Sequence, residues 1–466
     1  QLCGLDVSEF RSAQEKGEKL IGADVKVVSQ ARQLKNPDAI VSSDMSDICT
    51  YLSDYITAGK GICTGDSLRF IIKFWETTSS SNEWAFIRTA VQKTGFYDGL
   101  SHKLLWENGK GSFVEFVKER LGGSVGAWIR GRETWGNKGI SISRVSGLSA
   151  SLYNGEFSDD NAAVLIPVND EYVIPLWCYC YSGEFERDIK LVNQKLSVDN
   201  QYLGYVPFDI QNWQKVAEEK YPNGLPEPYS DDPTQWIFHG HPCGSVVWSE
   251  KSKKLEQGTL RKDSTVLQVS LARLLGYLWP AEKDASMELS EESRAWVKRS
   301  KELYPFADED GIVCVSPVRG EESAPDRIIK LLAAAYGDQW SPAVLNELLA
   351  ACDHAGKSLE SWLRDKFFAQ HCKLFMHRPF IWQIWDGLRD GFTALVNYHS
   401  FDNRKLQSLI YNYLGDWITR QKQDLASGID GAAEKLAAAE NLKKRLLMIL
   451  EGDAPYDIFV RWKPLA

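Results

Sequence analysis

Positive charge, aromatic rings and amides are concentrated in one stretch of this otherwise acidic chain, residues 126–154. Cations outnumber acids there, with Glu133 as the single acid, whereas the whole sequence carries a formal net charge of -9. The cations are Arg130, Arg132, Lys138 and Arg144, and the rings and amides among them are Trp128, Trp135, Asn137 and Asn154. Cations bind phosphates, while amides and guanidinium groups read base edges, so this combination is typical of a nucleic-acid-binding surface. The alternative is a solvated hairpin whose charges only keep it soluble.

The backbone of the same stretch is expected to turn tightly and then to form strands. Glycines recur through residues 131–147, and they allow close approach to a partner. From Ile140 to Val145, apolar residues alternate with Ser141, Ser143 and Arg144. This alternation predicts a strand with one face inward and one polar face outward.

Two other groups contain the residue types of a reactive site, histidine and cysteine, but lack the complete pattern of one. His239, His241 and Cys243 have an HxHxC spacing that could contribute metal ligands, yet a zinc site needs three or four and no further ligand follows at a finger-like interval. A hydrogen-bonded pair of loop histidines is the simpler interpretation, and a self-contained hydrolase using these residues is the competing one.

The second group suggests a Cys/His nucleophile, and its members are His371, Cys372, His377 and His399. Cys372 lies in an aromatic-rich segment, however, and a buried thiol is usually inert.

Known cofactor motifs are missing. The turn from Gly61 to Asp66 lacks the GxxxxGK[ST] order of a phosphate-binding loop. No two prolines are adjacent, which excludes the [DNS]PP[YFW] tetrapeptide with which amino-methyltransferases hold a flipped base. We therefore predict no catalytic residues, no bound cofactor and no metal in this chain.

The chain has 466 residues, which is long enough for about three domains that could position these residues. A hydrophobic content of 44% allows large cores. The 9 cysteines form no CxxC pair and indicate reduced thiols in a cytoplasm. No apolar run is long enough to cross a membrane, so no membrane partner is expected. Because the chain opens at Gln1 and ends soon after a strand-like segment at 457–462, we expect a piece of a longer polypeptide.

Periodicity and capping residues predict the secondary structure. The expected helices are 8–22 with Ser8 as N-cap, 47–58, 112–121, 176–194, 209–220, 267–277, 290–304, 326–336, 341–354, 358–370, 404–424 and 432–450. The expected strands include 69–75, 84–90, 103–106, 163–166, 172–174 and 311–316, with a hairpin formed by 380–385 and 391–398.

Several segments, taken in order, resemble one family: the large N6-adenine DNA methyltransferases of bacterial defence, of the type IIG restriction-modification, BREX and DISARM kind. The segments that carry the resemblance are 33–41, 61–76, 139–147, 196–209, 231–242, 267–280, 310–321, 367–387 and 391–400. In such proteins a catalytic domain binds S-adenosylmethionine, and a target-recognition domain follows. This chain resembles the part after the catalytic domain, since the cofactor and PP motifs are missing.

The resemblance implies an α+β fold, with a mixed β target-recognition domain followed by a mainly helical domain. The expected boundaries are connector helices at 1–60, the recognition domain at 61–225, a linker at 226–262, and a helical domain at 263–466 with the hairpin at 380–398. The expected function is to position double-stranded DNA for methylation of an adenine by a domain elsewhere, which would hold S-adenosylmethionine. The alternative is a scaffold subunit of a defence complex, without direct DNA contact.

Under this resemblance, residues 126–154, called the basic stretch from here on, supply the DNA contacts. Arg130, Arg132, Lys138 and Arg144 are candidates for phosphate or guanine contact, Asn137 and Asn154 for adenine edges, and Trp135 for stacking or wedging. Arg69 and Lys73 are weaker candidates, for the seam with the catalytic domain.

Overall fold

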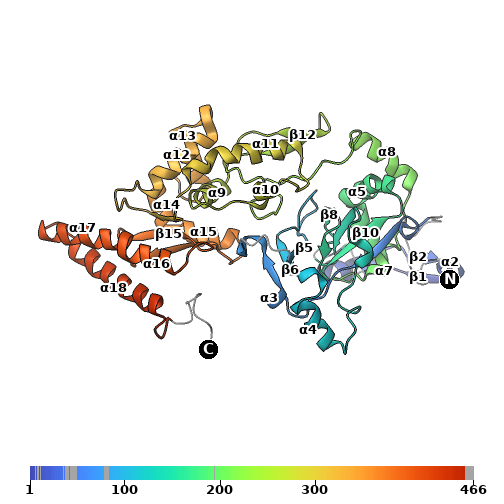
Figure 1. Ribbon diagram of the computed structural model, residues 1–466. Helices are drawn as coiled ribbons and strands as arrows, with labels where there is room; N and C mark the ends of the chain where they lie inside the picture. Colours follow the sequence, from blue (N-terminus) through green and yellow to red (C-terminus); the bar gives the residue numbers. More distant parts are fainter. Residues whose placement is uncertain are drawn as a thin grey trace. The chain divides into compact units, whose positions relative to one another are not determined.

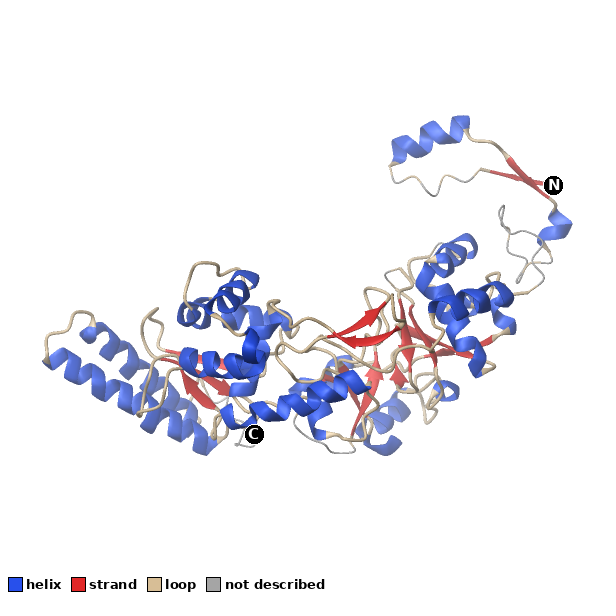
Figure 2. Ribbon diagram, turned by 90° about the horizontal axis from the view of Figure 1, so that it is seen from above, coloured by secondary structure: helices blue, strands red, loops and turns tan. Residues whose placement is uncertain are grey.

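The computed structural model describes most of the chain, namely residues 1–5, 7, 10, 12–34, 36, 41, 50–77, 83–145, 147–193 and 195–456. The chain forms two compact units, the first made of residues 1–71 and 82–225 and the second of 72–81 and 226–466. Figure 1 labels their elements, and Figure 2 shows helices in blue and strands in red. With 44% helix and 16% strand, the expected α+β class is confirmed.

The main sheet of the first unit has four strands in the order β3-β10-β7-β8, with antiparallel neighbours. Their bounds are Ile56–Lys60 for β3, Ala162–Pro167 for β10, Gly139–Ser143 for β7 and Ala150–Tyr153 for β8. Helix α5 (Val173–Ser182) packs against β7, β8 and β10. The expected strand from Ile140 is present.

The expected polar outer face of β7 is wrong, because Ser141 and Ser143 are buried. The Ser143 hydroxyl accepts a hydrogen bond from the Val91 N–H at 2.7 Å and donates one to the Val91 carbonyl at 2.9 Å. Another segment of the chain therefore covers that face. Small hydroxyl side chains can be buried in this way because the covering backbone satisfies them.

A second sheet has the order β4-β6-β5-β9, and its strands β5, β6 and β9 belong to the first unit. Its strands are β4 (Ile71–Lys73), β6 (His102–Leu105), β5 (Trp84–Arg88) and β9 (Phe157–Ser158). Next to it, α3 (Ser67–Phe70) and α4 (Ser112–Arg120) contribute to an aromatic core. The strand expected at 69–75 is in fact a short helix, a short strand and a helical turn, because the Asp66 side chain caps α3 by accepting the Arg69 N–H at 3.2 Å.

The remaining helices of the first unit are α6 (Glu184–Val192), α7 (Asn200–Leu203) and α8 (Ile210–Lys220). Asp209 caps α8 as expected. The strand expected at 172–174 is instead the start of α5, and the single helix expected at 176–194 is broken at Gly183, whose φ is 83°. Periodicity could not place this break, since both pieces keep an apolar face toward the core.

The N-terminal segment contains more than connector helices. Strands β1 (Leu2–Gly4) and β2 (Lys26–Val28) pair antiparallel, α1 (Ala13–Gly22) begins at an N-cap on Ser12, and α2 is Gln30–Gln33. The predicted cap at Ser8 lies outside the described residues. The helix expected at 47–58 is replaced over its described part by a short turn (Leu52–Asp54) and β3. Gly59 lies in β3, and a Cβ at this position would lie 2.2 Å from Thr134 Cγ2, so no larger residue fits there.

The segment 226–262, which composition predicts as a linker, is packed into the second unit. It forms the hairpin β11 (Val246–Ser249) and β12 (Lys254–Gln257), and Phe238, His239 and Cys243 are 0% exposed. Polar and glycine-rich composition suggested a loop, but the loop is held by buried hydrogen bonds described below.

Helices surround the main core of the second unit. They are α9 (Thr265–Leu274), α10 (Pro280–Lys283), α11 (Glu291–Ser300), α12 (Ala324–Tyr336), α13 (Pro342–Ala351), α14 (Leu359–Asp365) and α15 (Phe367–Leu374). The predicted N-caps Ser341 and Ser358 are confirmed. Trp75, from the segment 72–81, is fully buried in this core.

The predicted hairpin and the two long C-terminal helical segments are also confirmed. Strands β14 (Ile381–Trp385) and β15 (Thr393–Asn397) pair antiparallel, and β13 (Ile312–Cys314) pairs with β15. Helices α16 (Asn403–Ser408) and α17 (Leu414–Ala426) are joined by a π-helical turn at Leu409–Tyr413, and α18 (Ala432–Glu451) packs against α17 (Figure 1).

Candidate nucleic-acid interface

Close backbone contacts shape the turn of the basic stretch. The Gly136 N–H donates to the Gly155 carbonyl at 3.0 Å, and a Cβ added to Gly155 would lie 2.6 Å from the Gly136 Cα. Both glycines have positive φ, of 77° and 100°. The turn at 131–138 is therefore held against the end of the β7–β8 hairpin in a conformation that larger residues could not adopt.

The most exposed cations of the stretch lie on this turn. Arg132, Asn137 and Lys138 are all exposed. The Arg132 guanidinium lies over the Trp135 ring, 5.7 Å from its centre, and the Asn137 amide nitrogen donates to the Glu133 carbonyl at 2.9 Å. The turn thus presents two charged groups and an amide on a fixed backbone.

Trp135 itself belongs to the aromatic core. Its ring centre lies 4.5 Å from that of Phe157 and 5.6 Å from that of Trp106, with steep angles between the planes. In this position the indole supports Arg132 and fills the core, and stacking on a base would require it to move.

Arg130 and Arg144 are engaged within the chain. Arg130 Nη2 lies 2.5 Å from Asp160 Oδ1. Arg144 donates to the carbonyls of Val198 and Asp160, both at 2.9 Å, and lies 3.5 Å from Asp199 Oδ1. Both guanidiniums therefore tie the stretch to neighbouring loops, and a nucleic acid would have to compete with these carboxylates for them.

Asn154, at the end of β8, is half-buried, and its backbone N–H donates to Glu156 Oε2 at 3.2 Å. The same carboxylate group pairs with the buried Arg88, with Nη2 to Oε1 at 3.1 Å. Asn154 therefore lies beside an internal ion pair, and its neighbour Gly155 contacts the turn at Gly136.

Arg69 and Lys73, the two weaker candidates, belong to different units. Arg69 is exposed on α3 in the first unit. Lys73 belongs to the second unit, where burial lowers its pKa to about 8, against the opposing effect of Glu76. A partly buried lysine of this kind is a poorer phosphate ligand than an exposed arginine.

One cation near Arg69 was missed from the sequence. Arg120, the last residue of α4, has its guanidinium 5.3 Å from the centre of the Phe116 ring. The available signal was the spacing of Phe116 and Arg120, four residues apart on a predicted helix, which places both on one face.

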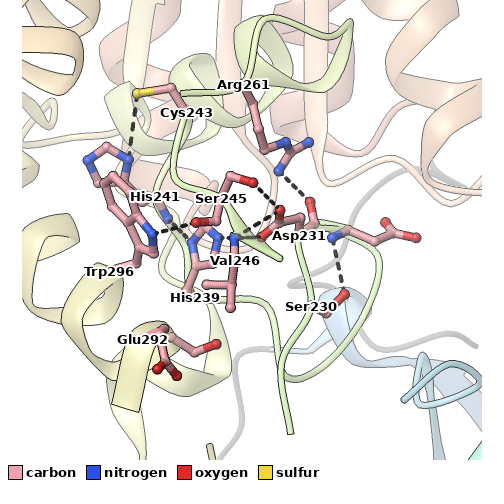
Figure 3. A network of polar contacts seen from close by, with 12 residues as sticks. Ser230, Asp231, His239, His241, Cys243, Ser245, Val246, Arg261, Glu292 and Trp296 are labelled. Atoms are coloured by element: carbon pink, nitrogen blue, oxygen red, sulfur yellow. Dashed lines mark hydrogen bonds and ion pairs between the residues drawn. The ribbon is translucent and has the colours of Figure 1, made fainter. Parts of the chain in front are cut away.

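The histidine and cysteine group at 239–243 forms a buried structural network (Figure 3). His239 Nδ1 accepts the His241 N–H at 3.0 Å, so the ring proton lies on Nε2, which faces Asp231 Oδ1 at 3.3 Å. Asp231 also accepts from the Ser245 hydroxyl at 2.8 Å and from the Val246 N–H at 3.1 Å. Burial lowers the pKa of His239, so the neutral ring is the stable form.

Cys243 and His241 are also in neutral forms. The Cys243 thiol lies 3.4 Å from the Ala335 carbonyl and 3.8 Å from His241 Nδ1, and burial raises its pKa to about 12. Burial also lowers the pKa of His241. A thiolate nucleophile needs the opposite shift. Among the described residues, no group of three or more His, Cys, Asp and Glu side chains could hold a metal ion.

The second His/Cys group likewise has structural roles. His371 is buried, and its Nε2 accepts the N–H groups of Phe380 and Ile381 at 3.3 and 3.2 Å. Its Nδ1 therefore carries the proton and lies 3.2 Å from Gln268 Oε1. Burial raises the pKa of the neighbouring Cys372 thiol, which does not favour a nucleophile.

Comparison with known proteins gives no family assignment. No family model matches the sequence, and no curated protein matches it. In the described part of the chain, no helix has both the length and the apolar composition that crossing a bilayer requires.

Proposed function

We propose that this chain is the DNA-recognition part of a site-specific adenine-N6 DNA methyltransferase of a bacterial defence system. It would bind double-stranded DNA through the first unit, and S-adenosylmethionine would be held by a catalytic domain outside this chain. The methyltransferase context comes from the ordered sequence resemblance. The DNA contact is argued from the charges of the first unit.

The observation that carries the DNA contact is the exposed turn at 132–138. It carries Arg132 and Lys138 against one exposed acid, Glu133, so its net charge is positive in a chain whose formal net charge is -9. Glycine contacts fix the backbone of the turn, and Trp135 supports the Arg132 side chain. A cation on a fixed support loses little conformational freedom when it binds a phosphate.

Arg130 and Arg144 have a different part in this proposal. Because both bind Asp160, they hold the turn against the loop that follows β9. We therefore assign the direct DNA contacts to Arg132, Lys138 and Asn137, with Arg69 as a further phosphate contact.

The test measures the affinity of the chain for a labelled DNA duplex across a salt series. The variant Arg132→Ala/Lys138→Ala removes two exposed cations, so we expect the slope of log K against log salt to become shallower by about 1.8. The matched control, Lys118→Ala/Lys215→Ala, removes two exposed lysines of the same unit, from α4 and α8.

Equal binding by the variant and its control would remove the turn from the interface. If the unaltered chain does not bind DNA at low salt but captures a protein of the same defence system, the scaffold alternative is correct. The acidic net charge is the feature that favours that alternative.

A further inference from the structure

Two exposed arginines of the first unit share one aromatic ring. The Arg69 guanidinium lies 4.9 Å from the centre of the Phe70 ring and 5.6 Å from that of Phe116. The Arg120 guanidinium lies 5.3 Å from the same Phe116 ring. Arg69 comes from α3 and Arg120 from the end of α4, so the tertiary structure brings them together.

Neither guanidinium is neutralised by an acid of the described part of the chain. Among the residues that the structure describes, no carboxylate is within ion-pair distance of Arg69 or Arg120, whereas Lys118 on the same helix lies 2.7 Å from Glu115 Oε1. A guanidinium that rests on a ring keeps the N–H donors at its edge available. The two guanidiniums therefore offer several donors to anions beside one ring.

The ring that supports this pair is well anchored. Phe116 lies 5.1 Å from Phe70 between ring centres, and Phe70 is 0% exposed and packs on Phe113 at 5.2 Å. The support is thus part of the aromatic core. Holding two rotamer-rich side chains in place before binding lowers the entropy that is lost when the anion binds.

This pair also adjoins the basic stretch. Phe116 lies 6.3 Å from the Trp128 ring between centres, and the Trp128 carbonyl accepts the Cys63 N–H at 2.9 Å. Gly65, with a φ of 67°, lies against the Trp128 ring, because a Cβ there would be 2.4 Å from Cζ3. The turn that leads into α3 is therefore packed directly on residues 126–154.

We propose that Arg69 and Arg120, supported by Phe116, form a phosphate-binding pair that contacts the backbone of the bound DNA. This inference rests on the proposed function and adds a second contact area to it. The pair recognises phosphate oxygens, and contacts to the DNA backbone carry no base specificity. It fixes the position of the duplex, while the turn at 132–138 packs on the same aromatic core through Trp135.

The test uses the whole chain, a labelled DNA duplex and a salt series from about 50 to 200 mM. For Arg69→Ala/Arg120→Ala we expect a salt slope shallower by about 1.8 and an affinity about tenfold lower, irrespective of the base sequence. Arg69→Lys/Arg120→Lys retains the charge, so it should keep most of the slope but lose affinity, because lysine has no planar edge of donors.

A third variant tests the support. Phe116→Leu keeps both arginines and an apolar side chain, so we expect the salt slope to remain and the affinity to fall about threefold as the stacking is lost.

Inorganic polyphosphate should compete with DNA for binding to the unaltered chain, and it should compete less well for binding to Arg69→Ala/Arg120→Ala. Circular dichroism and the midpoint of thermal unfolding establish that each variant is folded.

The outcomes separate this inference from the proposed function. If Arg132→Ala/Lys138→Ala weakens binding and Arg69→Ala/Arg120→Ala behaves like the Lys118→Ala/Lys215→Ala control, the phosphate pair is overturned. Arg69 is then also removed as a contact, and the proposed function stands on the turn at 132–138. If only the Arg69/Arg120 variant weakens binding, the turn at 132–138 fails and the phosphate pair stands. If the unaltered chain binds neither DNA nor polyphosphate at low salt, both proposals fail.

Discussion

In the first unit, Arg69, Arg120 and Arg132 are exposed and lie against aromatic rings, whereas in the second unit Arg273 and His239 are buried among hydrogen-bond partners. Arg273 Nη1 lies 2.8 Å from Glu282 Oε1 and its Nη2 donates to the Ser300 carbonyl at 2.8 Å. Arg69, Arg120 and Arg132 therefore have surroundings opposite to those of Arg273, although buried and exposed arginines occur in both units, as Arg88 and Arg299 show.

This difference separates charges that stabilise from charges that can bind. A buried ion whose partners all come from the chain is costly to disturb, and it has nothing left to offer a ligand. An exposed guanidinium on a ring contributes little to stability but keeps its donors available. We therefore expect substitutions of the buried charges to lower stability and substitutions of the exposed arginines to lower binding.

The largest effect is expected at the buried ion pair. Glu282→Gln leaves Arg273 as a buried charge without its carboxylate, so the free energy of unfolding should fall by about 3–5 kcal/mol. Urea denaturation followed by tryptophan fluorescence measures the loss. The double variant Arg273→Met/Glu282→Gln should recover part of the lost stability. If Glu282→Gln alone is as stable as the unaltered chain, the buried ion pair does not stabilise the second unit.

Acid should destabilise the second unit through its buried histidines. Burial lowers the pKa of His371 from 6.5 to about 3, so the folded state binds this proton more weakly than the unfolded state. The free energy of unfolding that neutral His371 supports is fully present above pH 6.5. It is lost as the pH falls toward 3, by about 1.4 kcal/mol per pH unit.

Between pH 6.5 and 5 the loss from His371 amounts to about 2 kcal/mol. Denaturation at several pH values should show a weaker pH dependence in His371→Gln than in the unaltered chain. His377→Gln, at an exposed position, is the control and should keep the full dependence.

A carboxyl group of the first unit should show the opposite sign. Burial raises the pKa of Asp159 to about 6, so the folded state binds its proton more tightly than the unfolded state. The stability that protonated Asp159 contributes is lost as the pH rises through 6, because the buried group must then ionise. Asp159→Asn cannot ionise, so it should stabilise the first unit by about 2 kcal/mol at pH 8.

Hydrogen exchange resolved by segment can assign the gain to the first unit. The neighbouring Asp160→Asn is a matched control, and it should destabilise because Asp160 binds Arg130 and Arg144. A gain in both variants would show that charge in general, and not the burial of Asp159, is responsible.

The smallest effect on stability is expected at the exposed turn. Arg132→Ala/Lys138→Ala should change the free energy of unfolding by less than about 0.5 kcal/mol, since both residues are exposed. Thermal unfolding of this variant measures the change. A loss comparable to that of Glu282→Gln would mean that the turn holds the fold together, contrary to its proposed role in binding.

Much of the secondary structure could be predicted because its signals are local. Asp209, Ser341 and Ser358 cap the helices that follow them, and the apolar face of α18 packs in the core as its spacing indicates. The failures occurred where distant contacts override local preference. The helix expected at 47–58 gives way to β3, whose Gly59 is approached by Thr134 so closely that no larger residue fits there.

The sequence by itself determined the α+β class, most helices of the second unit and the accumulation of cations at 126–154, because periodicity, capping and charge are properties of neighbouring residues. Only the tertiary structure decided which cations remain exposed. Arg130 and Arg144 both pair with Asp160, and Arg144 also pairs with Asp199, whereas Arg69 and Arg120 each lie against the Phe116 ring. These partners are far apart in the chain, and their distances depend on the packing of several elements, which no local pattern records.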